Sequence, residues 1–509
     1  MVSNELGYLS IRKKISQLLM PRVDFSEPNA LSYARELVKK NHIGGFIVFG
    51  GSMEVLRDYT EQLQNLSEFP LFFGCDAERG LGQKLSGSTV FPFAMSLGAI
   101  GDEELVYRQA SSISREMLYS GLNLIFAPVV DVNRNAENPI INIRSYGDDP
   151  NLVSRLGNAF IKGCQDNGVM ACAKHFPGHG NTGIDSHISL PNITQSKEDF
   201  YNFDLVPFVE AIGSGVAFIM IAHLYAPEIC KNGFPSTLSS EVIRDLLINR
   251  LGFDGLVISD SFQMGAITEY GKEENLARLA ISAGCDIILD PKEPLDLIES
   301  LRASVDDGAL PRHILDSAFL RVIDIKRKWL HRRIDGLTED ESGAELSEEI
   351  ARRSVCVIRG GRLRSKKVRI LVFDVTEDAK DLSLPFLARF SEYCKDCEVT
   401  WVRPSQMGIS IPSISSKEMG IVCLVYTSVG AWQRYFKLPD NFRKMLNLIG
   451  EMDCEKILVS FGSPYVVNRV KGFDTVICAF DRLDMCQVAV SDVLLGRLEA
   501  QGTLPVRLS

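Results

Sequence analysis

Residues 169–180 have the sequence VMACAKHFPGHG, in which a short apolar run ends abruptly in a lysine and a histidine. The apolar part, residues 169–173, has the length of a strand. Its lack of polar alternation is typical of strands that are buried on both faces. The stretch therefore predicts a buried strand whose carboxyl end presents polar side chains.

Similar runs recur along the chain and alternate with segments of helical pattern. The predicted strands are residues 45–49, 71–75, 122–128, 169–173, 216–222, 256–259 and 286–289. Strands that are joined by helical segments of ten or more residues usually pair in parallel, with the helices as crossovers. Seven or eight such units predict an α/β fold of the TIM type, a (β/α)8 barrel.

A charged segment of low hydrophobicity, about residues 332–349, interrupts this rhythm as a linker would. The rhythm then resumes with predicted strands at residues 368–375, 420–427, 456–461 and 475–480. Fewer strands in a shorter length fit an open, doubly wound sheet. We therefore expect a barrel over residues 1–336, a linker over residues 337–353 and a smaller α/β sandwich domain over residues 354–509.

The composition is that of a globular protein: of 509 residues, 45% are hydrophobic and 24% are charged. A formal net charge of −10 opposes binding to a phosphate backbone, so we expect no nucleic-acid partner. Apolar runs are far shorter than the roughly 18 to 20 residues that span a bilayer. The N-terminus lacks the pattern of a secretory signal. These features predict a soluble, cytoplasmic protein without membrane association.

The twelve cysteines are scattered without a disulfide framework. Many lie inside apolar runs, among them Cys172, Cys285, Cys423 and Cys478. Free cysteine behaves there as a small hydrophobic residue in a reducing compartment, so we expect no structural disulfides. Cys394 and Cys397 are the one close pair. They lack a second pair at zinc-finger spacing, so we expect a surface loop rather than a metal or redox site.

Polar residues follow the predicted barrel strands at the point where each strand ends. They are Asp76, Lys174, His175, His223 and Asp260. In barrel enzymes the chemistry takes place at the carboxyl ends of the strands. Any one of these residues alone would be read as a structural polar group. Five that converge on one rim predict an active site.

Three of the seven histidines lie between residues 175 and 187. A histidine pKa of about 6.5 permits proton transfer in both directions near neutral pH, and Asp185 is placed to orient His187. A metal site is the alternative, because His175 and His179 are four residues apart. Pro177 and Gly178 would interrupt the helix that such a pair of ligands requires, so we expect no metal.

Four segments resemble glycoside hydrolase family 3, and in particular its β-N-acetylglucosaminidase branch, which processes peptidoglycan fragments. They are CDAERGLGQKL (75–85), APVVDVNRNAENPIINIRSYGDDP (127–150), KHFPGHGNTGIDSH (174–187) and GFDGLVISDSFQMGAI (252–267). The third segment discriminates best, because Asp-x-His separates this branch from the β-glucosidase-like ones. Residues 456–506 also resemble the second domain of two-domain members.

The resemblance implies that Asp260 is the nucleophile of a retaining glycosidase and that His187, oriented by Asp185, is the proton donor. It further implies substrate contacts by Asp76, Lys84, Arg144, Lys174, His175 and His223. Lys84 stands where relatives carry an arginine, so it keeps a cation but loses the planar fork. For His223, substrate contact and a structural role remain equal alternatives.

We therefore predict a retaining exo-β-N-acetylglucosaminidase that releases terminal non-reducing GlcNAc from muropeptides in peptidoglycan recycling. Its substrate partner would be this GlcNAc-containing carbohydrate, and it would need no cofactor, because carboxylate and imidazole supply the chemistry. One alternative is a phosphorylase, in which phosphate replaces water. Others are a β-glucosidase or β-xylosidase, against which the Asp-x-His segment argues, and a non-catalytic carbohydrate sensor.

Overall fold

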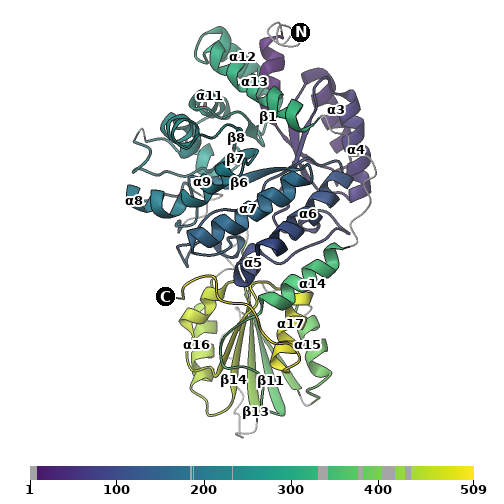
Figure 1. Cartoon of the computed structure of the whole chain (residues 1–509), viewed down its shortest axis with the longest axis vertical. Coiled ribbons are helices and arrows are strands. Elements are labelled where there is room, and N and C mark those ends of the chain that lie inside the picture. Colours follow the sequence, from purple (N-terminus) through teal and green to yellow (C-terminus); the bar gives the residue numbers. More distant parts are fainter. Residues whose placement is uncertain are drawn as a thin grey trace. The chain divides into compact units, whose positions relative to one another are not determined.

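The computed structural model describes residues 9–183, 186, 189–231, 233–330, 342–375, 382–395, 397–403, 419–429 and 437–508. The chain divides into two compact units (Figure 1). The first consists of Met1–Val90, Val106–Val132 and Ser154–Gly343, and the second of Phe91–Leu105, Asn133–Val153 and Ala344–Ser509. Two short segments from the first part of the sequence therefore belong to the second unit.

The first unit is built on a ring of parallel strands. These are β1 (Leu19–Met20), β2 (Arg22–Asp24), β3 (Gly45–Phe49), β4 (Phe72–Cys75), β5 (Leu124–Ile125), β6 (Met170–Phe176), β7 (Phe218–Ile221), β8 (Leu256–Ser259) and β9 (Ile288–Leu289). Strands β2 to β8 form one sheet in chain order, and their pairs are parallel. β1 pairs with β9, and Ile287 bridges Ile258 of β8. The strands thus close into the predicted barrel.

A single cluster of apolar side chains fills the ring. It takes alternate residues from the strands, such as Met170 and Cys172 of β6, because every second residue of a strand points to the same side. Gly74 of β4 is required by this packing, since a Cβ there would lie 2.6 Å from the ring of Phe126. The core holds the strand ends, and with them the polar residues, in fixed relative positions.

Helices alternate with these strands. They are α2 (Ile11–Ser16), α3 (Ala30–Asn41), α4 (Met53–Leu66), α6 (Glu103–Tyr119), α7 (Pro150–Asp166), α8 (Lys197–Asp199), η3 (Phe200–Asp204), α9 (Val206–Gly213), η5 (Glu241–Arg250), α10 (Gly265–Thr268), α11 (Glu273–Ala283), α12 (Pro294–Asp306) and α13 (Arg312–Trp329). Shorter 3₁₀ turns are η1 (Leu81–Gln83) and η4 (Ser236–Leu238). In α4 the hydroxyl of Ser52 caps the first turn and Leu56 and Leu63 are buried, as expected of an amphipathic helix.

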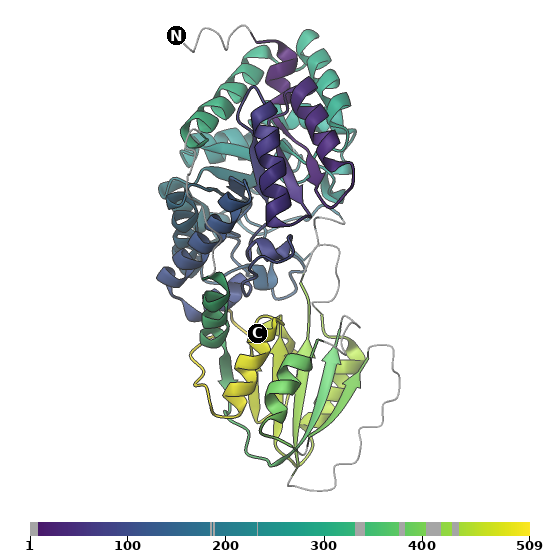
Figure 2. The ribbon, with the colours of Figure 1, turned by 90° about the vertical axis from the view of Figure 1, so that its right-hand side faces the viewer.

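The second unit contains a sheet, drawn in green and yellow in Figure 2. The sheet has six strands in the order β10-β15-β14-β13-β11-β12. The strands are β10 (Cys356–Arg359), β11 (Lys367–Asp374), β12 (Cys397–Val402), β13 (Met419–Tyr426), β14 (Lys456–Phe461) and β15 (Thr475–Cys478). β10 runs antiparallel to β15, and the other pairs are parallel.

Helices cover both faces of this sheet. They are α15 (Leu384–Ser391) and α17 (Asp484–Leu494) on one face and α16 (Asp440–Gly450) on the other (Figure 1). Alternate residues of β13 serve the two cores: Leu424 packs on the side of α15 and α17, and Cys423 on the side of α16. The unit also includes α5 (Ala94–Ile100), η2 (Asn142–Arg144), α14 (Gly343–Ser354) and η6 (Pro464–Arg469). The doubly wound α/β unit that the sequence predicts is confirmed.

The predicted linker needs correction, because residues 343–354 form helix α14. Leu346 and Ile350 lie four residues apart and are buried, whereas Glu345 and Glu348 are exposed. The charged composition that suggested a linker is therefore the outer face of an amphipathic helix. Residues 337–341 lie outside the described residues.

The predicted surface loop around Cys394 and Cys397 also differs from the structure. Cys397 begins strand β12, and Cys394 is buried against the core of the second unit. Both behave as small apolar residues. No helix in the described part of the chain is both long enough and apolar enough to cross a membrane.

Candidate active site

The polar residues predicted at strand ends lie at one end of the first unit's ring. Asp76 directly follows β4, Asp260 directly follows β8, and Lys174 lies in the last part of β6, which is longer than predicted. Burial raises the pKa of the Cys172 thiol in β6, and the charges of Lys174, Asp76 and Asp260 act on the same pKa. These three charges from different strands therefore lie near one another.

The ammonium group of Lys174 is held between two carboxylates. Its Nζ lies 2.9 Å from Oδ1 of Asp76 and 2.7 Å from Oε1 of Glu78. The Lys174 side chain is only 3% exposed, whereas that of Asp76 is 32% exposed. The buried cation thus keeps two acidic groups side by side, and one of them remains open to solvent and to a ligand.

His175 is oriented by a fully buried aspartate. Nδ1 of His175 lies 2.7 Å from Oδ2 of Asp131, and Oδ1 of the same carboxylate accepts the backbone N–H of His179 at 2.6 Å. Burial alone would raise the pKa of Asp131, but the charge and hydrogen bonds of His175 and His179 lower it. An ionised Asp131 accepts a hydrogen bond from the Nδ1–H group of His175, which leaves Nε2 of His175 for another partner.

Asp260 lies in a turn that backbone hydrogen bonds hold in place. Its N–H donates to the carbonyl of Ile221 at 3.0 Å, and its Oδ1 accepts the N–H of Ser261 at 2.8 Å. The residue is only partly buried, in contrast to the strand that precedes it. The carboxylate is therefore both positioned and accessible, which a nucleophile needs.

His223 does not have the character of a sugar-binding residue. It is fully buried, its Nε2–H donates to the carbonyl of Ser261 at 3.0 Å, and its Nδ1 pairs with the hydroxyl of Thr237 at 2.7 Å. Both ring nitrogens are thus engaged by the protein. We correct the predicted substrate contact to a positioning role for the turn that contains Asp260.

Lys84 and Arg144 lie in different units. The Lys84 ammonium is 4.9 Å from the centroid of the Phe49 ring, and Lys84 also acts on the pKa of Cys75 at the end of β4. This places Lys84 at the same end of the barrel as Asp76. Arg144 belongs to the second unit, where its guanidinium donates to the carbonyl of Ile140 at 2.8 Å.

Asp185 and His187 lie outside the described residues, so their roles remain predictions. Ser186, which stands between them in the sequence, is described. Its hydroxyl lies 3.1 Å from Nε2 of His179, and its carbonyl accepts the N–H of Ala266 at 3.2 Å.

Sequence reasoning missed Glu78, Asp131 and Asp290 as parts of this site. Asp131 follows the apolar run of residues 122–128 by a few positions, so the strand-end signal that marked Asp76 would have found it. Asp290 follows β9 in the same way. Glu78 lies two residues beyond Asp76, and only its ion pair with Lys174 identifies it.

The described residues contain no group of three or more His, Cys, Asp or Glu side chains arranged to hold a metal ion. What the site presents is an accessible carboxylate, a buried cation between two acidic groups, and an oriented imidazole. These groups can attack an electrophilic carbon, bind hydroxyl groups and transfer protons.

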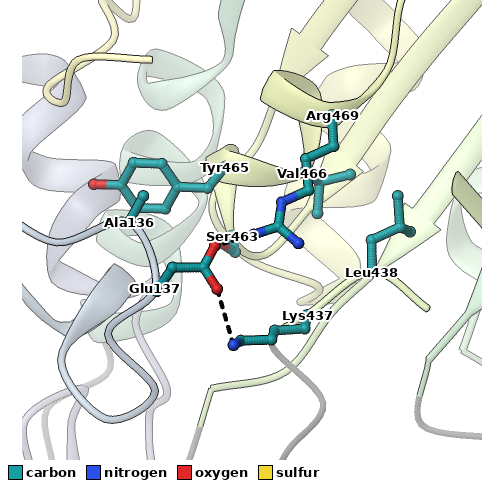
Figure 3. Close-up of a pocket in the computed structure, with 8 residues that line it drawn as sticks. All are labelled: Ala136, Glu137, Lys437, Leu438, Ser463, Tyr465, Val466 and Arg469. Carbon is teal, nitrogen blue, oxygen red and sulfur yellow. Dashed lines mark hydrogen bonds and ion pairs between the residues drawn. The ribbon is translucent and has the colours of Figure 1, made fainter. Parts of the chain in front are cut away.

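The second unit has a surface pocket whose lining includes Glu137, Lys437 and Arg469 (Figure 3). Glu137 occupies its centre, 2.9 Å from Nζ of Lys437 and also paired with Arg469. The two cations lower the pKa of Glu137, chiefly through the hydrogen bond with Lys437. Since the carboxylate already balances one of the two cations, the pocket shows no catalytic arrangement comparable to that of the barrel.

Comparison with known proteins relates this chain to one family of enzymes. Residues 10–325 match the glycosyl hydrolase family 3 N-terminal domain. The chain is 30% identical over 396 residues to a β-N-acetylglucosaminidase/β-glucosidase of Cellulomonas fimi, covering 74% of this chain and 70% of the relative. It is 34% identical over 274 residues to a β-hexosaminidase of Thiobacillus denitrificans, covering 52% of this chain and 75% of the relative.

Solved structures agree with this relationship. A glycoside hydrolase family 3 β-N-acetylglucosaminidase from a Paenibacillus species superposes with a TM-score of 0.86 at 30% identity, covering 98% of this chain and 99% of that one. A β-glucoside phosphorylase superposes with a TM-score of 0.90 at 22% identity, covering 99% of this chain and 96% of the other, which shows a shared fold.

Proposed function

Because this chain belongs to glycosyl hydrolase family 3, we propose that it hydrolyses terminal, non-reducing β-linked N-acetylglucosamine with retention of configuration. It is a glycoside hydrolase that acts on O-glycosyl bonds. In the retaining reaction a carboxylate attacks the anomeric carbon, and water then hydrolyses the covalent intermediate. We assign the attacking carboxylate to Asp260.

The observation that carries this proposal is the state of Asp260. It is a partly exposed carboxylate at the end of an otherwise buried strand, fixed by its own backbone N–H and by that of Ser261. A negative charge held in this way also stabilises the positive charge that develops on the sugar ring in the transition state.

The neighbouring polar groups suit a sugar. Asp76 presents a partly exposed carboxylate to accept hydroxyl hydrogens, and Lys174 holds it in place. His175 has its Nδ1 bound to Asp131, so its Nε2 is left to serve a hydroxyl or the acetamido group. Lys84 is proposed to complete these contacts, and the substrate contact of Arg144 stays a prediction from the sequence.

We assign the proton donor to His187, oriented by Asp185. This assignment rests on the resemblance of residues 174–187 to the β-N-acetylglucosaminidase branch. The physical advantage of an imidazole is that it is neutral after it has donated its proton. It then repels neither Asp260 nor an incoming anion, as a second carboxylate would.

The test compares hydrolysis of a chromogenic β-GlcNAc with that of the matching β-glucoside, for the wild type and for Asp260→Ala. We expect selective release from the β-GlcNAc, and loss by a factor of about 10⁴ or more in the variant, since one barrier-lowering group is removed entirely. Added azide should restore activity to Asp260→Ala and give the inverted glycosyl azide. Full activity in Asp260→Ala would contradict the assignment of the nucleophile.

The same assay run with and without inorganic phosphate distinguishes hydrolysis from phosphorolysis. Free GlcNAc formed at an unchanged rate supports hydrolysis. A sugar phosphate that appears only with phosphate would instead identify a phosphorylase. Binding of GlcNAc without turnover of any glycoside would identify a carbohydrate sensor.

We propose further that the natural substrates are GlcNAc-containing muropeptides and that the enzyme acts in the cytoplasm, in peptidoglycan recycling. Support for a reducing compartment comes from the cysteines, because ten of the twelve are buried as free thiols. Incubation of purified GlcNAc-anhydro-MurNAc peptides with the enzyme should release GlcNAc. A rate far below that for simple GlcNAc disaccharides would count against this substrate.

A further inference from the structure

Asp290 is a buried carboxylate that binds the turn after β8 with both of its oxygens. Oδ2 accepts the hydroxyl of Ser261 at 2.8 Å, and Oδ1 accepts Nε2 of Gln263 at 2.7 Å. Between these two bonds, the N–H of Phe262 donates to the carbonyl of Leu289 at 3.0 Å. The three residues that follow the proposed nucleophile are therefore all bonded to the end of β9.

Arg22 of β2 binds both oxygens of the same carboxylate. Its Nη2 lies 2.6 Å from Oδ2 of Asp290, and its Nε lies 3.3 Å from Oδ1. The side chain of Asp290 is fully buried, whereas that of Arg22 is 47% exposed. A planar guanidinium that binds through two nitrogens fixes the plane of the carboxylate. It thereby fixes the directions in which the two oxygens accept from Ser261 and Gln263.

The strand pairing of the barrel brings Arg22 and Asp290 together. β1 pairs with β9 so that Met20 lies beside Leu289, and the N–H of Asp290 donates to the carbonyl of Met20 at 2.8 Å. Arg22 and Asp290 follow these paired residues at once in the sequence. The guanidinium also packs on the ring of Phe49, with Cζ 4.6 Å from the ring centroid. Arg22 is thus held by its own strand and by an aromatic face.

A second arginine–aspartate pair precedes β9 and provides a comparison within the same barrel. Asp286 is also fully buried, and Nε of Arg321 donates to its carboxylate at 2.8 Å. The Asp286 carboxylate also accepts the backbone N–H of Val257 in β8 at 2.9 Å. That pair joins helix α13 to the sheet. The Arg22 pair instead joins β2 to the turn that contains the proposed nucleophile.

We propose that Arg22 is a positioning residue for the reaction, because through Asp290 it fixes the turn that presents Asp260 to the anomeric carbon. This inference rests on the proposed function, in which Asp260 is the nucleophile. Arg22 contacts no substrate in this scheme. A carboxylate that is displaced from its line of attack costs rate rather than affinity, since its alignment matters most in the transition state.

The test compares Arg22→Ala with Arg321→Ala on a chromogenic β-GlcNAc, well below the unfolding temperature of each variant. We expect Arg22→Ala to lower kcat and kcat/KM together by roughly tenfold to 100-fold, the size of a lost hydrogen bond to a charged group. KM should change by less than about twofold, because the loss falls on the transition state. Arg321→Ala removes a similar ion pair, so it should lower the unfolding temperature and leave kcat unchanged.

Two small cations test whether the guanidinium itself is needed. Methylguanidinium at millimolar concentration should restore part of the kcat of Arg22→Ala, because the missing side chain is partly exposed in the wild type. Methylammonium at the same ionic strength should restore less, since it lacks the planar fork. Neither cation should change the kcat of Arg321→Ala. A general loss of stability would not produce this dependence on the shape of the cation.

Arg22→Lys is the conservative variant. It keeps the charge and loses the planar fork, so its kcat should lie between those of the wild type and Arg22→Ala. If Arg22→Ala does not fold, the comparison of Arg22→Lys with Arg321→Lys replaces it, and only the first of these should have a lower kcat.

Three results would overturn the inference. They are a kcat of the Arg22 variant within about twofold of the wild type, equal losses of kcat in the Arg22 and Arg321 variants, and a raised KM with unchanged kcat, which would make Arg22 a substrate-binding residue. Wild-type protein without activity, or Asp260→Ala with full activity, would contradict the proposed function itself. An active wild type with an inactive Asp260→Ala leaves that function standing, whatever the Arg22 variants show.

Discussion

The hydroxyl of Ser261 donates to the carboxylate of Asp290 at 2.8 Å, immediately beside the proposed nucleophile Asp260. Asp290 is fully buried at the end of β9. Its carboxylate also accepts hydrogen bonds from Nε2 of Gln263 at 2.7 Å and from Nη2 of Arg22 at 2.6 Å. Asp290, directly after β9, therefore fixes the turn after β8 through the hydrogen bonds from Ser261 and Gln263.

Asp290→Asn should reduce kcat more than it raises KM. The amide accepts less strongly than a carboxylate, so the bonds from Ser261 and Arg22 weaken and the Asp260 turn loses support. Hydrogen bonds to charged groups contribute about 1.5–3 kcal/mol, which corresponds to roughly a tenfold to 100-fold effect. Kinetics on a chromogenic β-GlcNAc measure this. The control is Asp316→Asn in α13. It weakens an ion pair in which Nζ of Lys14 lies 2.7 Å from Oδ1 of Asp316, and it should leave kcat unchanged.

Lys174→Met should lower kcat/KM by roughly 100-fold or more. Removal of the cation leaves Asp76 and Glu78 adjacent without compensation, and like charges at this distance disfavour ionisation of both. One of them should then take up a proton, and activity should depend more steeply on pH. Lys14→Met is the control, because Lys14 is also a buried lysine with one ion pair. A drop in activity of similar size in both variants would show that only stability is affected.

The barrel was predictable because its signal is local. Residues 45–49 and 256–259 are continuous apolar runs, and they coincide with β3 and β8. Strands β10 and β12 were missed because they lie at the two edges of their sheet and carry polar residues such as Arg359 and Glu398. Their pattern resembles that of a loop.

The site was predictable only in part. The strand ends marked Asp76, Lys174 and Asp260. The hydrogen-bond partners of the His223 ring are Thr237 and Ser261, which are distant from it in sequence. The membership of Phe91–Leu105 in the second unit is likewise a long-range property. Such contacts leave no local pattern in the chain.

Lys84→Met should raise KM for a chromogenic β-GlcNAc by about tenfold and change kcat less, because a binding cation is lost before the reaction begins. Lys84→Arg should lower KM, since the planar fork can pair with two acceptors at once. Nζ of Lys84 lies 4.9 Å from the centroid of the Phe49 ring, and Cζ of Arg22 lies 4.6 Å from it. The ring can therefore pack against a guanidinium as well as an ammonium group. Unchanged KM in Lys84→Met would remove Lys84 from the binding site.

The stability of the protein should fall on acidification between about pH 6.5 and about pH 4 because of His179. Its pKa is about 4 in the folded protein and about 6.5 in an unfolded chain. Between these values the unfolded chain binds a proton that the folded protein excludes, so the free energy of unfolding rises with pH. The slope reaches about 1.4 kcal/mol per pH unit, or about 3 kcal/mol in total. Asp131 acts in the same direction but at lower pH, because its lowered pKa makes its contribution to stability disappear only below the usual aspartate range.

The variant His179→Gln tests this, because glutamine does not titrate. Urea unfolding of this variant should show a flatter pH dependence than that of the wild type between about pH 6.5 and about pH 4. His313→Gln replaces an exposed histidine of α13 and should keep the slope of the wild type. Parallel curves for the wild type and His179→Gln would mean that the pKa of His179 is the same in the folded and the unfolded protein, which would contradict the lowered pKa.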